Sequence, residues 1–158
     1  MQTYRTYGYL KYDPVSETTR HDPWWLILMC PMGLALLYQD LIYRDASKVV
    51  VAHEVFGFGD WPVRKKQVKV KKSVWGPHIS LIRGEEPLNK ELWRKYEGRK
   101  IWFEYSPIVG TNGYHYWLPV FSEEFSAIRV ELGLSPEPRA PFHFTIGRDV
   151  DAPPATRN

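Results

Sequence analysis

Two short segments of the chain carry the same reactive residue types at the same spacing. "HISLIR" spans 78–83 and "HFTIGR" spans 143–148, and each has a histidine, a hydroxyl residue two positions later and an arginine five positions later. The histidines lie 65 positions apart (143 minus 78). Each segment is expected to be the last strand of a helix-containing unit of similar length. This repetition predicts two pseudo-equivalent lobes.

The spacing within each segment gives the repeat a chemical meaning. Side chains two positions apart on a strand point to the same face, so His78 projects with Ser80, and His143 projects with Thr145. If the lobes face each other across a two-fold axis, two imidazoles and two hydroxyls meet in one cleft. Such a set can cleave a phosphodiester without a metal, because a neutral histidine takes the proton of the attacking hydroxyl or water and a charged histidine protonates the departing oxygen. The hydroxyls would donate hydrogen bonds to the non-bridging oxygens, where negative charge accumulates.

The two arginines of the segments are conditional candidates for phosphate binding. Arg83 and Arg148 stand five positions after their histidines, and an odd offset points a side chain to the opposite face of an ideal strand. They reach the cleft only if each strand ends or bulges first, which Gly84 and Gly147 would permit. The alternative for each arginine is a surface ion pair or one that bridges the lobes.

The elements that must position these residues alternate between strands and helices, which predicts an α+β fold. Ser122 can cap the third expected helix and Gly133 can end it. Asn112-Gly113 is the strongest hairpin signal in the chain. Expected strands cover 7–12, 24–30, 48–56, 74–83, 100–109, 114–121 and 141–148, and expected helices cover a segment from Pro31 to Arg44, 87–98 and 122–133.

Composition limits the class of protein. The chain has 158 residues, 44% of them hydrophobic, and a formal net charge of +3, which fits one globular domain over 1–150 with a disordered tail over 151–158. Cys30 is the only cysteine, so no internal disulfide can form. The most apolar segment, 24–37, contains Pro31 and is shorter than the roughly 20 residues of a spanning helix, so we expect buried core and no membrane partner. With no apolar leader, a cytoplasmic location is expected.

The segment 64–72, "RKKQVKVKK", is the most basic part of the chain, with six basic residues among nine. Val68 and Val70 alternate with Lys69 and Lys71, which is typical of an edge strand protected by lysines or of a solvated loop. The other interpretation is electrostatic guidance of a ligand that carries phosphate.

The paired histidine pattern, in a chain of this size and element order, resembles the 2H phosphoesterase superfamily. These two-histidine enzymes include bacterial RNA 2′,3′-cyclic phosphodiesterases, LigT-like proteins and phage nucleases that destroy the cyclic-nucleotide signals of CBASS immunity. The resemblance covers about 24–148, and the long basic stretch 46–73 departs from the pattern. It implies a bilobal, pseudo-two-fold α+β fold with two antiparallel sheets, flanking helices and a central cleft. It also implies catalysis without metal or cofactor by His78, Ser80, His143 and Thr145.

The same resemblance implies a nucleotide or oligonucleotide substrate, such as a cyclic oligonucleotide signal, a 2′,3′-cyclic phosphate or an oligoribonucleotide, and an anti-CBASS-type role is one possibility among these. Aromatic side chains would stack on the bases, although aromatic residues of this kind more often belong to the core. Tyr116 and Trp117 alternate, so at most one of them lines the cleft. The candidates are Trp75, Tyr105, Trp117 and Tyr12.

Three other interpretations compete with this one. A zinc site from His53, His78, His115 and His143 lacks the spacing of metal ligands. A serine hydrolase would need a G-x-S-x-G turn, which the chain does not contain. The serious rival is a non-catalytic nucleotide- or RNA-binding module that uses the lysine-rich segment. None of these interpretations requires an obligate protein partner.

Overall fold

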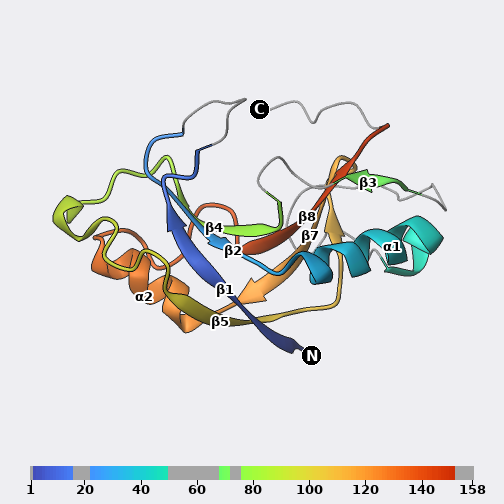
Figure 1. The fold of residues 1–158 in the computed structure, drawn as a ribbon, viewed down its shortest axis with the longest axis horizontal. Helices are drawn as coiled ribbons and strands as arrows, with labels where there is room; N and C mark the ends of the chain where they lie inside the picture. Colours follow the sequence, from blue (N-terminus) through green and yellow to red (C-terminus); the bar gives the residue numbers. More distant parts are fainter. Residues whose placement is uncertain (1, 16–21, 50–67, 72–75, 152–158) are drawn as a thin grey trace.

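A computed structural model describes residues 2–15, 22–49, 68–71 and 76–151. Within these ranges the protein is an α+β fold built from a closed antiparallel sheet and two α-helices (Figure 1). The predicted fold class is therefore confirmed at this level. The strands are β1 (Tyr4–Tyr12), β2 (Trp25–Met29), β3 (Val70–Lys71), β4 (His78–Arg83), β5 (Lys100–Tyr105), β6 (Gly110–Thr111), β7 (His115–Phe121) and β8 (His143–Asp149).

The strands form one sheet, where two separate sheets were expected. Their order is β3-β8-β4-β2-β1-β5-β7-β6, and an additional pairing of β8 with β7 closes six of them into a ring. The single sheet follows from β8, which pairs with β4 through Phe144 and Ile79 and with β7 along most of its length. The two histidine strands are thus direct neighbours.

One face of this sheet forms the hydrophobic core. Alternate residues of each strand enter it, among them Leu26 and Leu28 of β2, Ile79 of β4 and Phe144 of β8, all fully buried. Strand β2 is buried along nearly its whole length, as its continuous apolar run predicted. The residues between these core positions point to the opposite face of the sheet.

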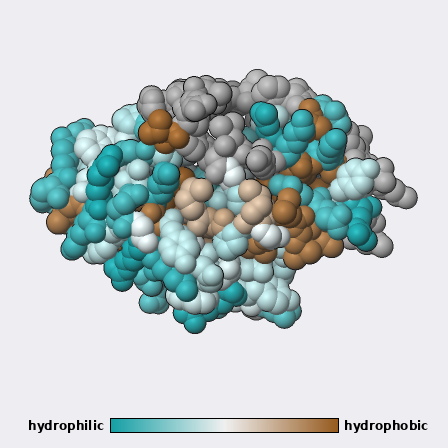
Figure 2. All heavy atoms as spheres, viewed as in Figure 1, coloured by the Kyte–Doolittle hydropathy of each residue, from teal (hydrophilic) through white to brown (hydrophobic). Residues whose placement is uncertain are grey.

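The two helices lie at opposite ends of the molecule (Figure 1). Helix α1 (Met32–Val49) contacts β8 and β3, and it buries Tyr38 and Ile42 in the core. Its outward positions leave hydrophobic side chains exposed, and brown atoms gather at this end of the molecule in Figure 2. These side chains are Met32, Leu36, Leu37, Leu41 and Tyr43. Helix α2 (Glu123–Glu131) begins after Ser122 and ends before Gly133, at φ +82°, as the sequence indicated. The Ser122 hydroxyl does not cap the helix, because it donates to the Trp102 carbonyl oxygen at 3.2 Å.

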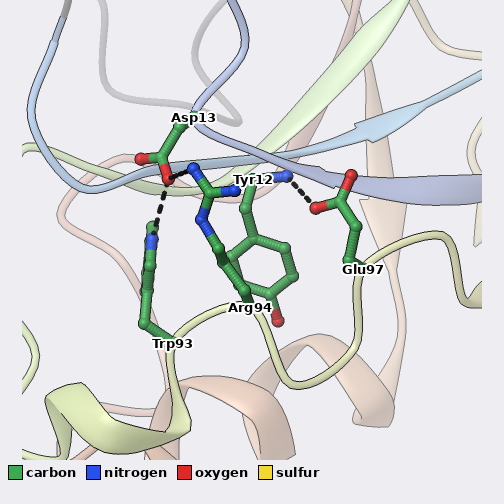
Figure 3. Close-up of polar contacts among 5 residues, drawn as sticks. All are labelled: Tyr12, Asp13, Trp93, Arg94 and Glu97. Carbon is green, nitrogen blue, oxygen red and sulfur yellow. Dashed lines mark hydrogen bonds and ion pairs between the residues drawn. The ribbon is translucent and has the colours of Figure 1, made fainter.

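The helix expected over 87–98 does not form. The segment contains one short 3-10 helix, Lys90–Leu92, followed by turns, with Arg94 at φ +71°. Contacts from the end of β1 and from Asp13, which follows it, override the helical pattern. Asp13 accepts hydrogen bonds from Trp93 Nε1 at 3.1 Å and Arg94 Nη2 at 2.8 Å, and Glu97 accepts one from the Tyr12 amide at 2.8 Å (Figure 3). Regular helix would not present both side chains to one carboxylate, since adjacent positions point about 100° apart.

Parts of the sequence-based expectations fall on segments outside the described residues. The expected strand over 48–56 lies largely there, together with Trp75, residues 64–67 and the tail from 152. Of the lysine-rich segment, the described residues 68–71 end in β3, which pairs with β8. Val68 and Val70 are buried, while Lys69 and Lys71 are exposed. Across the described ranges, no helix has both the length and the apolar character needed to cross a bilayer.

Candidate active site

The two histidine segments meet side by side in the sheet. Strands β4 and β8 are antiparallel, with Ile79 opposite Phe144. This register brings His78 beside Thr145 and Ser80 beside His143. Since Ile79 and Phe144 point into the core, the other four side chains share the opposite face. We call His78, Ser80, His143 and Thr145 the polar cluster.

Both imidazoles are oriented by the same backbone device. Nδ1 of His78 lies 2.9 Å from the Gly76 carbonyl oxygen, and Nδ1 of His143 lies 2.8 Å from the Pro141 carbonyl oxygen. A carbonyl only accepts, so each neutral ring carries its hydrogen on Nδ1 and keeps a lone pair on Nε2. In both segments the acceptor is the residue two positions before the histidine. The matching hydrogen bonds prepare each Nε2 to take or return a proton.

A tryptophan packs against each histidine from the neighbouring strand. The ring centroids of Trp25 (β2) and His78 are 6.1 Å apart, and those of Trp117 (β7) and His143 are 6.0 Å apart, both edge to face. Trp25 is 2% exposed and Trp117 is 5% exposed. The tryptophans therefore act as walls that fix and desolvate the imidazoles, and bury too much of their surface to offer open platforms.

Trp25 also determines the direction of one hydrogen bond made by the Ser80 hydroxyl. Its Nε1 donates a hydrogen bond to Ser80 Oγ at 3.1 Å. Because an indole N–H only donates, Ser80 Oγ must be the acceptor. The serine O–H then remains to donate its own hydrogen to an anion. A donor is what is needed to bind a non-bridging phosphate oxygen.

Burial lowers the pKa of both histidines below the ordinary imidazole value. For His78 the largest cause is desolvation, the Gly76 carbonyl opposes it, and the charges of His143 and Arg83 lower the pKa further. For His143 desolvation lowers the pKa and the Pro141 carbonyl opposes it. Both rings therefore favour the neutral form near neutral pH, and His78 carries the additional penalty of nearby positive charge.

A β-bulge brings Arg83 to the face of the polar cluster. Ile27 pairs with Ser80 and Leu26 with Ile82, so Leu81 is an extra residue in β4. Leu81 and Ile82 consequently both enter the core, and the alternation shifts by one position. Arg83 then stacks over Trp25 at 4.5 Å from the ring centroid and forms an ion pair with Asp22 at 2.7 Å. The bulge condition is met, but at Leu81 and not at Gly84.

The same irregularity occurs in β8. Trp117 pairs with Thr145 and Tyr116 with Gly147, which leaves Ile146 as the extra residue. Arg148 therefore returns to the face of Thr145, and its Nη1 donates to Tyr114 Oη at 3.1 Å. Gly147, at φ +155°, is required here, because an added Cβ would lie 2.1 Å from the Lys71 carbonyl oxygen of β3. Both arginines thus reach the face that their odd spacing alone would deny them.

A buried arginine holds the bulge of β4. Arg129 of α2 is 1% exposed, and its Nη1 donates to the Leu81 carbonyl oxygen at 2.9 Å. Its Nε donates to the Ser135 carbonyl oxygen at 2.7 Å, and its Nη2 pairs with Glu85 at 2.6 Å. The extra carbonyl of the bulge is thereby satisfied, as a buried polar group must be. Sequence reasoning missed Arg129, since a lone arginine on an amphipathic helix carries no signal of its partners.

The structure separates the predicted aromatic candidates. Trp117 lies beside the polar cluster. Tyr105 does not, because it shares the core face of β5 and stacks with Tyr4, the centroids being 5.7 Å apart. Tyr12 does not either, since it is buried in the core against Trp93, and burial raises its pKa to about 12. Trp75 is outside the described residues. Trp25, which sequence reasoning overlooked, takes the place on β2 that Trp117 takes on β7.

The histidine, cysteine, aspartate and glutamate side chains of the described residues form no group of three or more that could hold a metal ion. Comparisons with protein-family models, with curated proteins and with solved structures found no match to this chain. The function is therefore inferred from the geometry of the polar cluster.

Proposed function

We propose that this protein is a metal-independent phosphodiesterase of the 2H type, which acts on a nucleotide or RNA phosphodiester through His78 and His143. The observation that carries the proposal is the joining of two distant histidine segments into one cluster, with matching carbonyl, tryptophan and bulge at each half. A bilobal pseudo-two-fold architecture is part of this proposal. A purely structural role for the histidines gives no reason for this duplication.

The reaction follows from the positions of the donors and acceptors. Nε2 of a neutral histidine takes the proton of a water, or of the substrate's own ribose 2′-hydroxyl, as the new O–P bond forms. The other histidine, protonated, gives its Nε2 proton to the departing oxygen as the old O–P bond breaks. The Ser80 and Thr145 hydroxyls donate to the non-bridging oxygens, and Arg83 and Arg148 supply positive charge at the rim.

His78 is assigned as the base and His143 as the acid. The base must be neutral before reaction, and the positive charges of Arg83 and His143 disfavour protonation of His78. The acid must carry a proton, and burial lowers the pKa of His143 without a contribution from an arginine. A bound phosphate, being anionic, stabilises the charged form of the nearer imidazole. The substrate thus completes the charge state that the reaction needs.

The proposal is tested by turnover with EDTA present. The panel contains cyclic dinucleotides, cyclic trinucleotides, 2′-5′ and 3′-5′ oligonucleotides and 2′,3′-cyclic nucleotides, with products separated by chromatography. The expected result is EDTA-resistant cleavage of at least one class, lost in the His78→Ala/His143→Ala variant. A Lys90→Gln variant, remote from the polar cluster and paired with Glu86, is the matched control.

One outcome supports the rival binding module. If no substrate is turned over, while the double histidine variant binds one of them as tightly as the unaltered protein, the histidines have no catalytic role. An activity that EDTA removes and zinc restores would likewise overturn the metal-independent mechanism.

A further inference from the structure

A second surface on the same sheet face combines exposed aromatic rings with positive charge. It lies on β1 and β5, whose cross-strand pairs here are Tyr7 with Trp102 and Tyr9 with Lys100. Tyr9 is 49% exposed and Trp102 is 41% exposed. The surface consists of Arg5, Tyr7, Tyr9, Lys11, Lys100 and Trp102, and we call it the β1–β5 platform.

The platform is continuous with the polar cluster through direct strand pairing. His78 pairs with Met29, Met29 with Tyr9, and Tyr9 with Lys100. A second row runs from Ser80 through Ile27 to Lys11. Paired residues share a face, and neighbouring strands are about 4.8 Å apart. Tyr9 therefore lies two strands, or roughly 10 Å along the sheet, from His78.

The cations of the platform already lie over its rings. Lys100 Nζ is 4.0 Å from the Tyr7 ring centroid and 4.9 Å from that of Trp102, and the Arg5 guanidinium is 4.8 Å from the Trp102 centroid. Tyr7 meets Tyr9 and Trp102 edge to face. Lys100 and Arg5 are exposed, so their long side chains can swing from the rings to a phosphate.

We propose that the β1–β5 platform binds single-stranded nucleic acid, stacking bases on Tyr9 and Trp102 and contacting phosphates with Lys11, Lys100 and Arg5. Alternating cations and exposed aromatics fit a chain that alternates phosphates and bases. A carboxylate on this face, that of Glu104, stands four residues beyond Lys100 and pairs across the strands with Arg5. The charge at the end nearer His78 is thus positive.

This inference extends the proposed function, and it rests on that function only in assigning the platform to substrate. A strand held on β1 and β5 and running across β2 would bring a phosphodiester to β4 and β8. The substrate class is then an oligonucleotide of several residues, because a mononucleotide in the polar cluster could not also reach Tyr9. Duplexes bind weakly, since their bases are stacked internally and unavailable to the rings.

The test measures binding separately from cleavage. Fluorescence anisotropy of a labelled ten-residue oligouridylate is recorded with EDTA, in the His78→Ala background, so that turnover plays no part. Tyr9→Ala and Trp102→Ala are each expected to weaken binding about tenfold, given the usual strength of base–aromatic stacking. Tyr43→Ala on α1 is the matched control, because Tyr43 is also 49% exposed but lies elsewhere.

Salt dependence tests the charged half of the platform. For single strands, the slope of log K against log salt grows by about 0.7 for each phosphate that a protein cation neutralises. Lys100→Gln is expected to reduce the slope by about that amount, while Lys90→Gln leaves it unchanged. Thermal melts of all variants confirm folding.

Three results would overturn the inference. They are equal binding of duplex and single-stranded RNA, equal effects of Tyr9→Ala and Tyr43→Ala, and tight binding of heparin that none of the ring variants alters. Each concerns binding alone, so a failure here is distinct from the absence of turnover that would defeat the phosphodiesterase proposal.

Discussion

The β4 and β8 halves of the candidate active site share a backbone plan and differ in the partners of their arginines and in the exposure of their histidines. In the β4 half, Trp25 engages Ser80, and Asp22 pairs with the arginine that stacks on the same indole. In the β8 half, Arg148 contacts the neutral Tyr114 hydroxyl. His78 is buried and His143 is half-buried. The β4 half is therefore held more tightly than the β8 half.

This difference indicates a division of labour. A fixed, desolvated imidazole beside positive charge suits a base that must be neutral at the start. A more accessible imidazole suits an acid that must meet the departing group and then recover a proton from solvent. The same backbone arrangement can thus serve a base in one half and an acid in the other, depending on the groups that surround each histidine.

The largest expected effect comes from removing the histidines one at a time. His78→Ala and His143→Ala should each lower kcat/KM by about 10²-fold or more on a substrate with a poor leaving group. A p-nitrophenyl phosphodiester separates the roles, because its departing oxygen needs no proton. On that substrate His143→Ala should regain most of its activity and His78→Ala should not. The reverse pattern would exchange the acid and base assignments.

The next effect concerns the two devices that hold the bulges. Arg129→Met leaves the carbonyls of Leu81 and Ser135 and the Glu85 carboxylate without their donor, and should cost about 3 kcal/mol of unfolding free energy, as the loss of a buried ion-pair partner does. Gly147→Ala should cost about 1–3 kcal/mol, because its Cβ would collide with the Lys71 carbonyl. Urea unfolding followed by circular dichroism measures both.

A second glycine, Gly84, gives the control for that pair. Gly84 also has a positive φ, of +73°, but no described atom lies within 4 Å of an added Cβ. Gly84→Ala should therefore carry only the conformational penalty of about 1–2 kcal/mol. If Arg129→Met proves as mild as Gly84→Ala, the guanidinium is not what holds the β4 bulge.

The bulges of β4 and β8 could not be predicted from the sequence. Alternating or continuous runs of apolar residues predicted strands close to β1, β2, β4, β5, β7 and β8, and the i, i+2 spacing placed His78 with Ser80. No local pattern in the sequence shows that the side chains of Leu81 and Ile82 both point into the core, because this depends on the register in which β4 pairs with β2. The expected helix over 87–98 failed for a related reason, because Asp13, far away in sequence, captures Trp93 and Arg94.

The closing of the sheet was also beyond sequence reasoning. The repeat indicated two similar units, but only the pairing of β8 with both β4 and β7 makes them one sheet. Which tryptophans lie against the histidines also depended on strand pairing. The apolar run 24–30 predicted a buried strand, yet that Trp25 would meet Ser80, and Trp24 would not, depended on the register in which Ile27 pairs with Ser80.

A smaller effect tests the hydrogen bond that Ser80 accepts from Trp25. Trp25→Phe keeps a ring against His78 and removes the indole donor, so kcat/KM should fall about three- to tenfold, the usual range for one hydrogen bond. In a Ser80→Ala background the same change should have no further effect, because the acceptor is already absent. Additive losses from Trp25→Phe and Ser80→Ala would mean that the indole acts only by packing.

The smallest effect is a displacement of one limb of the pH profile. Activity needs neutral His78 and protonated His143, so kcat/KM should rise with pH as His78 loses its proton and fall as His143 does. Because both pKa values lie below the usual 6.5, the maximum should also lie on the acidic side of that value. Arg83→Gln removes a charge that lowers the pKa of His78, so that pKa rises and the acidic limb moves to higher pH. The alkaline limb of the Arg83→Gln profile should stay in place.

Arg148→Gln provides the comparison for that shift, since burial lowers the pKa of His143 and Arg148 is not among its causes. It should change the height of the profile through weaker phosphate binding while leaving both limbs where they are. Measuring kcat/KM from pH 4 to 9 for the two variants separates these effects, because a loss of substrate affinity scales the curve and a change in pKa displaces it. Movement of the alkaline limb in Arg83→Gln would identify His78 as the acid, and the tightly held half of the site would then be the one that releases the proton.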